Sequence, residues 1–420
     1  MHDTSGSQRI SGTASTVPAP SEIVVGVPSC NHAATVAQVL RTAQAGLGES
    51  LSGHSSLLVS ADLRSSDGTR AQVHELRAEN PLLRELGPAD GAGGTTGPEV
   101  EGRELRMILG TTHEVHARVC LVLDASVTTM TADWIARLVR PILDHQFDLV
   151  APCFARHKLD GGISNGIVYP LTRALYGKRV RQPLSSVCAL SGRLVEHFLA
   201  RKVWDIEVLA LSTDARALSE TICGEFAVCQ ALLGPAEHAG GGPSLDLSTI
   251  LATVLGSVFD EMNRNVAFWQ KVRGSEPVRW FGTPVEIADN PPPVDVHKMW
   301  ESFRLGCRTL QDVWSVVLPP ATLLALKYLA QADAATLADD LWARIVYDFA
   351  LGYRLHVINR GHLLRALTPL YLGWLASFVR EMGNAPAQEV ERRVHLLCVA
   401  YEAQKPYLIS RWRWPDRFNP

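Results

Sequence analysis

Residues 118–124 read RVCLVLD, and this stretch decides the fold class of the chain. An apolar, β-branched run that stops at an acidic residue is typical of a buried parallel strand that ends in a polar loop. Similar short apolar runs occur in residues 23–28 (IVVGVP), 56–62 (SLLVSAD) and 147–152 (FDLVAP), of which the second also ends in an acidic residue. Runs with helical spacing, at residues 35–45 and 134–143, lie between these strands.

This alternation of strands and helices predicts an open, mostly parallel sheet with helices on both faces. In such sheets a ligand binds beyond the carboxyl ends of the strands. Asp62 and Asp124 stand at two of these ends. The sequence therefore predicts an α/β domain with a polar binding site at one edge of its sheet.

The predicted sheet domain covers residues 21–244 and follows a tail. Residues 1–20 are rich in Ser, Thr and Pro without an apolar core, which predicts a disordered tail and no signal peptide. After residue 244 helical periodicity dominates, as in residues 341–358 (LWARIVYDFALGYRLHVI), which are amphipathic at helical spacing. We therefore expect a mainly α-helical region over residues 245–420.

The composition limits the classes of function. With 46% hydrophobic residues and a net charge of −3, the 420-residue chain can bury a core but lacks the basic field of a nucleic-acid-binding protein. Eight cysteines without a CxxC pair predict free thiols rather than zinc ligands or disulfides. The apolar run at residues 367–379 is too short to span a bilayer. We expect a soluble, cytoplasmic protein with no membrane span and no nucleic-acid partner.

Several long strings resemble one family. They are VVGVPSCNHAATVAQVL, SADLRSSDGT, LVLDAS, GGISNGIVYPLTRALYGKRVRQPLSSVCALSG, CQALLGPAEHAG and RIVYDFALGYRLHVINRGHLLRALTPLYLG. In this order they resemble bacterial GT-A-fold glycosyltransferases related to mannosylglycerate synthase and glucosyl-3-phosphoglycerate synthase. The resemblance covers almost the whole chain after Ser21. It implies a GT-A (Rossmann-like, mostly parallel sheet) domain followed by a mainly α-helical C-terminal region.

The resemblance also implies a reaction. A hexosyl unit would pass from a nucleotide sugar, a UDP- or GDP-sugar, to a small polar or acidic acceptor of the glycerate type. The departing diphosphate must be stabilised by Lys, Arg or a divalent cation, and Mg or Mn suits hard oxygen ligands and imidazole. The family's nucleotide pocket maps onto Pro28, Ser29, Asn31 and Asp62. Read alone, these residue types indicate a turn.

The metal motif is only partly present. The family's Asp-x-Asp maps onto Asp124 and Ser126, so a neutral hydroxyl replaces the second acid. His238 matches the family's later metal-ligand histidine, although a histidine in a Gly-rich loop is otherwise typical of an exposed side chain. The resemblance thus implies a weak Mg or Mn site at Asp124 and His238.

Two further family motifs have changed. The donor-contacting lysine of a Gly-Lys-Gly motif maps onto Glu101, and Arg103 or Arg106 could take its place if the alignment shifts. Repulsion between Glu101 and a phosphate would replace attraction.

The family's Gly-Gly-acid loop maps onto Ser185, Ser186 and Val187. The two hydroxyls could still bind the donor sugar. The alternative interpretation is a strand-edge loop packed by Val187 and Leu190.

The catalytic position and the acceptor side come last. Asp214 matches the family aspartate near the acceptor and the reacting sugar carbon, which implies a catalytic role; read alone, it is a helix cap. The helical region carries polar groups that would complete an acceptor site or an oligomer interface, and otherwise form ordinary amphipathic helices: Tyr347, Asp348, Tyr353, Asn359, Arg360 and His362.

Two hypotheses follow from these departures. The first is a hexosyltransferase, whose activity could be weak because three motif positions have changed together. The second is a catalytically silent glycosyltransferase paralogue that acts as a binding or regulatory module. The first hypothesis predicts nucleotide-sugar binding that improves with Mn or Mg, and the second does not.

Overall fold

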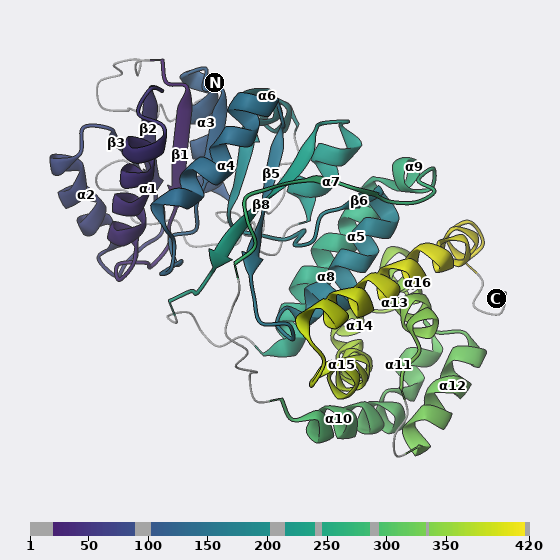
Figure 1. Cartoon of the computed structure of the whole chain (residues 1–420). Helices are drawn as coiled ribbons and strands as arrows, with labels where there is room; N and C mark the ends of the chain where they lie inside the picture. Colours follow the sequence, from purple (N-terminus) through teal and green to yellow (C-terminus); the bar gives the residue numbers. More distant parts are fainter. Residues whose placement is uncertain are drawn as a thin grey trace, which may run out of the picture. The chain divides into compact units, whose positions relative to one another are not determined.

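The chain forms two compact units, each made of several segments of the sequence. The computed structural model describes residues 20–88, 102–201, 215–239, 246–285, 294–332 and 336–415 (Figure 1). The first unit comprises residues 1–150, 186–210 and 236–239, and the second comprises residues 151–185, 211–235 and 240–420. The division expected from the sequence, at residue 244, stays a prediction, and residues 1–19 of the expected tail lie outside the described residues.

The first unit is built on a mostly parallel sheet. Its strands follow the order β3-β2-β1-β4-β7-β5. The bounds are β1 Ile23–Pro28, β2 Ser56–Ala61, β3 Leu83–Leu86, β4 Val119–Val122, β5 Leu149–Ala155 and β7 Cys188–Ser191. β1, β2, β3 and β4 pair in parallel, and β7 is antiparallel to both of its neighbours. β5 continues into the second unit, where the strand order goes on through β8 (Val228–Pro235) and β10 (Arg279–Phe281).

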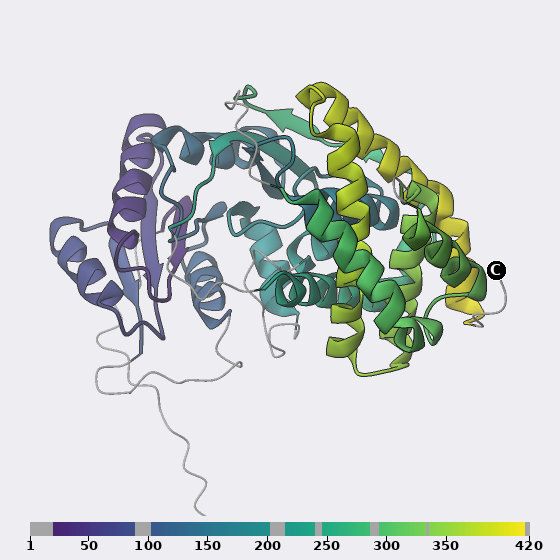
Figure 2. The same ribbon diagram turned by 90° about the horizontal axis from the view of Figure 1, so that it is seen from below.

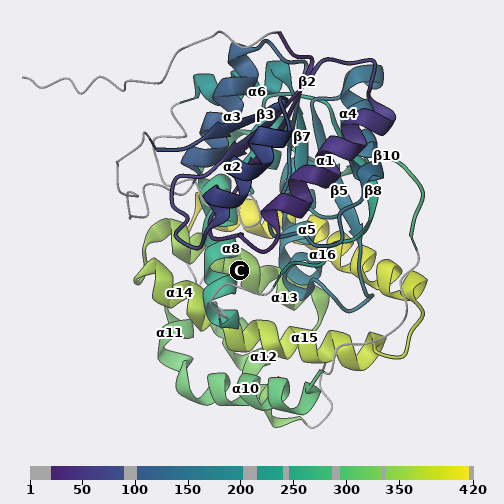
Figure 3. The same ribbon diagram turned by 90° about the vertical axis from the view of Figure 1, so that its left-hand side faces the viewer.

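Apolar runs explain the central strands, since every residue of β4 and all of β1 except Pro28 are buried. α1 (Val36–Ser50) and α4 (Ala132–His145) cover one face, and α3 (Arg103–Glu114) and α6 (Gly192–Ala200) cover the other (Figure 3). Gly26 in β1 lets α3 approach closely, because a Cβ there would lie 2.2 Å from Cγ2 of Ile108. α2 (Thr69–Glu79) connects β2 to β3.

The second unit is mainly helical in its later part. After the π-helical turn η2 (Ser164–Val168), its helices are α5 Tyr169–Tyr176, α7 Arg216–Cys223, α8 Leu247–Arg264, α9 Val266–Trp269, α10 Val296–Thr309, α11 Gln311–Ser315, α12 Pro320–Gln331, α13 Asp339–Leu355, α14 Arg360–Ala366, α15 Thr368–Met382 and α16 Ala387–Arg413. Two short strands, β6 (Lys178–Arg179) and β9 (Glu276–Pro277), pair in parallel. α13 and α16 run beside each other (Figure 2), and the hydroxyl of Tyr347 donates to the backbone oxygen of Tyr401 across them (2.7 Å).

The predicted α/β architecture is confirmed: a mostly parallel sheet with helices on both faces, followed by a mainly α-helical C-terminal region. The four apolar runs form β1, β2, β4 and β5, and the run at residues 367–379 lies almost wholly in the buried helix α15. A further strand that the apolar runs did not predict is β3, in which Glu85 and Leu86 pair with β2. All eight cysteines are free thiols. Within the described residues, no helix is long and apolar enough to cross a membrane.

Candidate functional site

Asp62 organises a tight turn after β2. Its Oδ1 accepts from the backbone amides of Arg64 (3.1 Å) and Ser65 (2.9 Å). Its Oδ2 accepts from the hydroxyl of Ser29 (3.4 Å), which follows β1. Asp62 and Ser29 are each 4% exposed. The structure therefore brings these two predicted pocket residues together, but the carboxylate of Asp62 already has three donors within the chain.

Asn31 ties the loop after β1 to the same turn. Its backbone is in the left-handed region (φ 59°), which asparagine tolerates better than most residues. Its amide donates to the hydroxyl of Ser65 (2.7 Å), and its side-chain oxygen accepts from the amide of Ser66 (2.9 Å). Asn31 is exposed, and Pro28, the last residue of β1, is half-buried. Pro28, Ser29, Asn31 and Asp62 thus share one edge of the sheet.

Asp124, Ser126 and His238 form a second cluster at this edge. The hydroxyl of Ser126 donates to Oδ1 of Asp124 (2.6 Å) and lies 2.9 Å from Nδ1 of His238. That Nδ1 is 3.6 Å from Oδ2 of Asp124. A β-bridge between Val127 and His238 and a bond from the amide of Ala239 to the oxygen of Ser126 (2.9 Å) fix the histidine segment here.

Hydrogen bonds keep Asp124 charged. Burial alone would raise the pKa of its carboxyl, but the side chains of Ser126 and Ser186, the amide of Ser126 and the nearby His238 together lower that pKa below its ordinary value. The site therefore holds a carboxylate at neutral pH, with a half-exposed imidazole beside it.

The cluster places a carboxylate and an imidazole side by side, with Oδ2 of Asp124 and Nδ1 of His238 3.6 Å apart. These are residue types that could hold Mg or Mn. Within the described part of the chain, no three His, Cys, Asp or Glu side chains are grouped so as to hold a metal ion.

Arg64 is a cation at this edge that sequence reasoning missed. Its Nε donates to Oε1 of Glu104 (3.0 Å), a carboxylate that is 4% exposed in the first turn of α3. The signal in the sequence is an arginine two residues after the strand-end Asp62. Arg103 and Arg106, the expected lysine substitutes, are exposed on α3, while Glu101 lies outside the described residues.

The residues of the loop before β7 lie in different surroundings. Ser186 bonds to Asp124 and so belongs to the cluster. Val187 is 1% exposed and Leu190 is 3% exposed, as the strand-edge interpretation of this loop expects. Ser185 is half-buried and falls in the second compact unit. Asp214, the predicted catalytic residue, lies outside the described residues.

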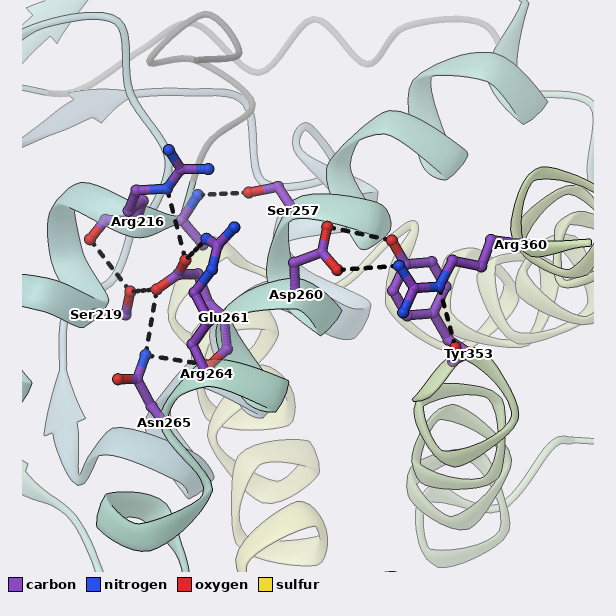
Figure 4. Close-up of polar contacts among 10 residues, drawn as sticks. Arg216, Ser219, Ser257, Asp260, Glu261, Arg264, Asn265, Tyr353 and Arg360 are labelled. Carbon is purple, nitrogen blue, oxygen red and sulfur yellow. Dashed lines mark hydrogen bonds and ion pairs between the residues drawn. The ribbon is translucent and has the colours of Figure 1, made fainter. Parts of the chain in front are cut away.

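The polar residues of the helical region serve contacts within the second unit. The hydroxyl of Tyr353 donates to Asp260 (3.2 Å), and the guanidinium of Arg360 stacks on the ring of Tyr353 with its carbon 4.2 Å from the centroid (Figure 4). Asn359 caps α14 by accepting from the amide of His362 (3.1 Å). These contacts place the predicted acceptor-side residues in the packing of α8, α13 and α14.

The next residue of α8, Glu261, faces the opposite way (Figure 4). Its carboxylate lies 3.6 Å from Nε of Arg216 and 2.5 Å from Nη1 of Arg264, and it accepts from the hydroxyl of Ser219. Glu261 is 1% exposed. This buried charge cluster, which joins α7 to α8, was not predicted from the sequence.

A cavity of about 490 Å³ in the first unit lies away from the predicted residues. Arg118, Asp148 and Gly192 line it, at the amino ends of β4 and β5 and the end of β7. Asp62 and Asp124 lie at the carboxyl ends, where ligands of such sheets bind. We therefore place the candidate site at the two carboxylate clusters.

No protein-family model and no curated protein matches the chain in sequence. Among solved structures, it is similar to glucosyl-3-phosphoglycerate synthase from Mycobacterium tuberculosis in complex with Mn2+, UDP and glucosyl-3-phosphoglycerate. That match has a TM-score of 0.41 and 18% identity, and covers 58% of this chain and 80% of that chain. A mycobacterial protein matches with a TM-score of 0.41 and 20% identity over 58% and 74% of the two chains.

Proposed function

We propose that the protein is a nucleotide-sugar glycosyltransferase that transfers a hexosyl unit from a UDP- or GDP-sugar to a small polar or acidic acceptor of the glycerate type. The observation that supports this proposal is the pairing of Asp124 with His238 at the carboxyl edge of the sheet. A carboxylate and an imidazole side by side suit a cation that neutralises a departing diphosphate. The turn built by Asp62 and Ser29 lies at the same edge and would contact the nucleoside.

Each residue has a role in this proposal. Pro28, Ser29, Asn31 and Asp62 would hold the nucleoside, and Asp124 and His238 would hold Mg or Mn. A bound cation would supply charge stabilisation to the diphosphate. Arg64 would add a positive charge beside the phosphates.

The reacting sugar would meet a second group of residues. Ser185 and Ser186 would contact the donor sugar, and Asp214 would act near the reacting carbon.

A second candidate function is a catalytically silent binding or regulatory module. Two observations favour it. Ser126 occupies the position beside Asp124 where a second acid would strengthen a cation site, and the carboxylate of Asp62 has three donors within the chain.

A cytoplasmic location and the division of domains at residue 244 remain parts of the proposal.

The two candidates differ in donor binding and turnover. We would titrate UDP-glucose and GDP-mannose into the full chain with and without Mn, by calorimetry and thermal shift, and assay sugar transfer to glycerate and 3-phosphoglycerate. The transferase proposal expects metal-dependent binding that is lost in Asp124→Asn and kept in the exposed control Asp144→Asn. Metal-independent binding without turnover would favour the silent module, and no nucleotide binding at all would refute the proposed function.

A further inference from the structure

The hydroxyl of Thr35 does not do what its position in the chain suggests. Thr35 is the N-cap of α1, where a threonine side chain usually accepts a hydrogen bond from an amide of its own helix. It makes no such capping bond. Its Oγ1 instead donates to the backbone oxygen of Ala125, 90 residues later in the chain, over 2.6 Å. Thr35 is 5% exposed, so this bond is buried.

The bond from Thr35 holds a peptide group of the candidate cation site. The peptide unit between Ala125 and Ser126 is planar, so its carbonyl and its N–H turn together. The carbonyl accepts from Thr35, and the N–H donates to Oδ1 of Asp124 (2.8 Å). A donor at the carbonyl also polarises the N–H of the same unit and strengthens its bond to the carboxylate. The hydroxyl of Thr35 therefore fixes the group that orients Asp124.

A second side chain of α1 holds the same loop. Nε2 of Gln38, which lies one turn after Thr35, donates to the backbone oxygen of Thr128 (3.1 Å). The amide of Thr128 in turn donates to the backbone oxygen of Glu237 (2.9 Å), which precedes His238. The first turn of α1 thus supports the segments of both candidate cation ligands.

We propose that Thr35 is a positioning residue for the cation, which it affects through the Ala125–Ser126 peptide unit and Asp124. This inference rests on the proposed function, in which Asp124 and His238 hold Mg or Mn. Without the hydroxyl, the peptide unit can turn, its N–H leaves Asp124, and the carboxylate loses the orientation in which it meets the imidazole at one ion. A hydroxyl with a purely structural role would stabilise the first unit without changing its affinity for a cation.

The test compares two isosteric substitutions of buried threonines in the first unit. Thr35→Val removes the hydroxyl that reaches Ala125, and Thr112→Val removes one that donates to the backbone oxygen of Ile108 within α3 (2.8 Å). Both should lower the melting temperature, since each loses a buried hydrogen bond. Mn binding to the full chain with UDP or GDP in excess, measured by electron paramagnetic resonance, should weaken about tenfold in Thr35→Val alone. Thr35→Ser keeps the hydroxyl and should bind Mn as the wild type does.

A second pair of variants keeps the test decisive if Thr35→Val does not fold. Gln38 and Gln44 are both exposed on α1, and Gln38 is the one that bonds to Thr128. Gln38→Leu should weaken Mn binding about threefold, because it removes the other hydrogen bond from α1 to the loop. Gln44→Leu should leave Mn binding unchanged.

Three outcomes would contradict the inference. Equal Mn affinity of Thr35→Val and the wild type would overturn it and leave the proposed function standing. Equal weakening in Thr112→Val, or no recovery in Thr35→Ser, would overturn it too, because the loss would then follow stability instead of the hydroxyl. A wild type that binds no Mn in the presence of UDP or GDP would overturn the proposed function, and this inference with it.

Discussion

Nδ1 of His238 lies 2.9 Å from the hydroxyl of Ser126, although 112 residues separate them in the sequence. Ser126 in turn donates to Asp124, so one small hydroxyl links the two candidate metal ligands. The side chain at position 126 therefore affects the negative charge beside the two candidate ligands, where a cation would bind.

Ser126→Asp should strengthen metal-dependent donor binding. The change adds a charged oxygen beside Asp124 and within reach of His238, which hard divalent cations prefer to a neutral hydroxyl. Without metal the two carboxylates should repel each other and lower the melting temperature, and Mn should restore it. Calorimetry with Mn and UDP-glucose measures the gain.

Ser126→Asn is the control for this change, because it has nearly the same shape as aspartate without its charge. Equal Mn responses of the Asp and Asn variants would show that Asp124 and His238 do not share an ion.

Asp62→Ala should destabilise the first unit as well as weaken nucleotide binding. The carboxylate accepts from two part-buried backbone amides and from the buried hydroxyl of Ser29, so its loss removes the partner of all three donors at a cost of about 1–3 kcal/mol. Urea denaturation measures this cost. Ser29→Ala removes only the long 3.4 Å bond and should cost less. An Asp62→Ala variant as stable as the wild type would show that the turn does not depend on this carboxylate.

Asp348 should make the stability of the second unit depend on pH. Burial raises the pKa of its carboxyl from 3.8 to about 7, although Arg411 and Tyr407 favour the charged form. The folded state then holds a proton that the unfolded state releases, so the contribution of Asp348 to stability is full below about pH 4, falls as the pH rises towards 7 and levels off above it. The difference amounts to at most about 4 kcal/mol.

The pH dependence of Asp348→Asn provides the check, because this variant cannot titrate at position 348. The melting temperature of the wild type relative to the variant should fall between pH 4 and 7. A constant difference across that range would mean that Asp348 stays ionised beside Arg411.

Glu261→Gln should destabilise the contact between α7 and α8 by about 3 kcal/mol, because it removes the buried charge between Arg216 and Arg264. The neighbouring Asp260→Asn is the matched control, since that carboxylate is 39% exposed and exposed ion pairs contribute about 1 kcal/mol or less. Chemical denaturation of both variants compares the two costs. Similar losses would contradict the view that burial makes Glu261 the more important of the two.

The fold class could be predicted because its signals are local. The apolar runs of β1 and β4 indicate that both faces of these strands are covered. Most of the amphipathic run at residues 341–358 forms one helix, α13, which ends at Leu355. β3 was not predicted because its sequence, LREL, is short and mixes apolar with charged residues. It forms a strand by pairing with β2, and a local sequence pattern does not show that pairing. β7 and β8 were missed for the same reason, since strand pairing is set by tertiary context.

The sequence by itself determined which chemical groups stand at the carboxyl ends of the strands. Asp62 and Asp124 follow apolar runs, and parallel strands bring such ends to one edge. Only the tertiary structure decided how these groups are used. In the folded chain, Asp62 accepts hydrogen bonds from two backbone amides, the hydroxyl of Ser126 lies beside Nδ1 of His238, and Val187 is buried in the core. Hydrogen-bond partners and burial depend on distances between segments far apart in the chain, and residue order alone does not contain those distances.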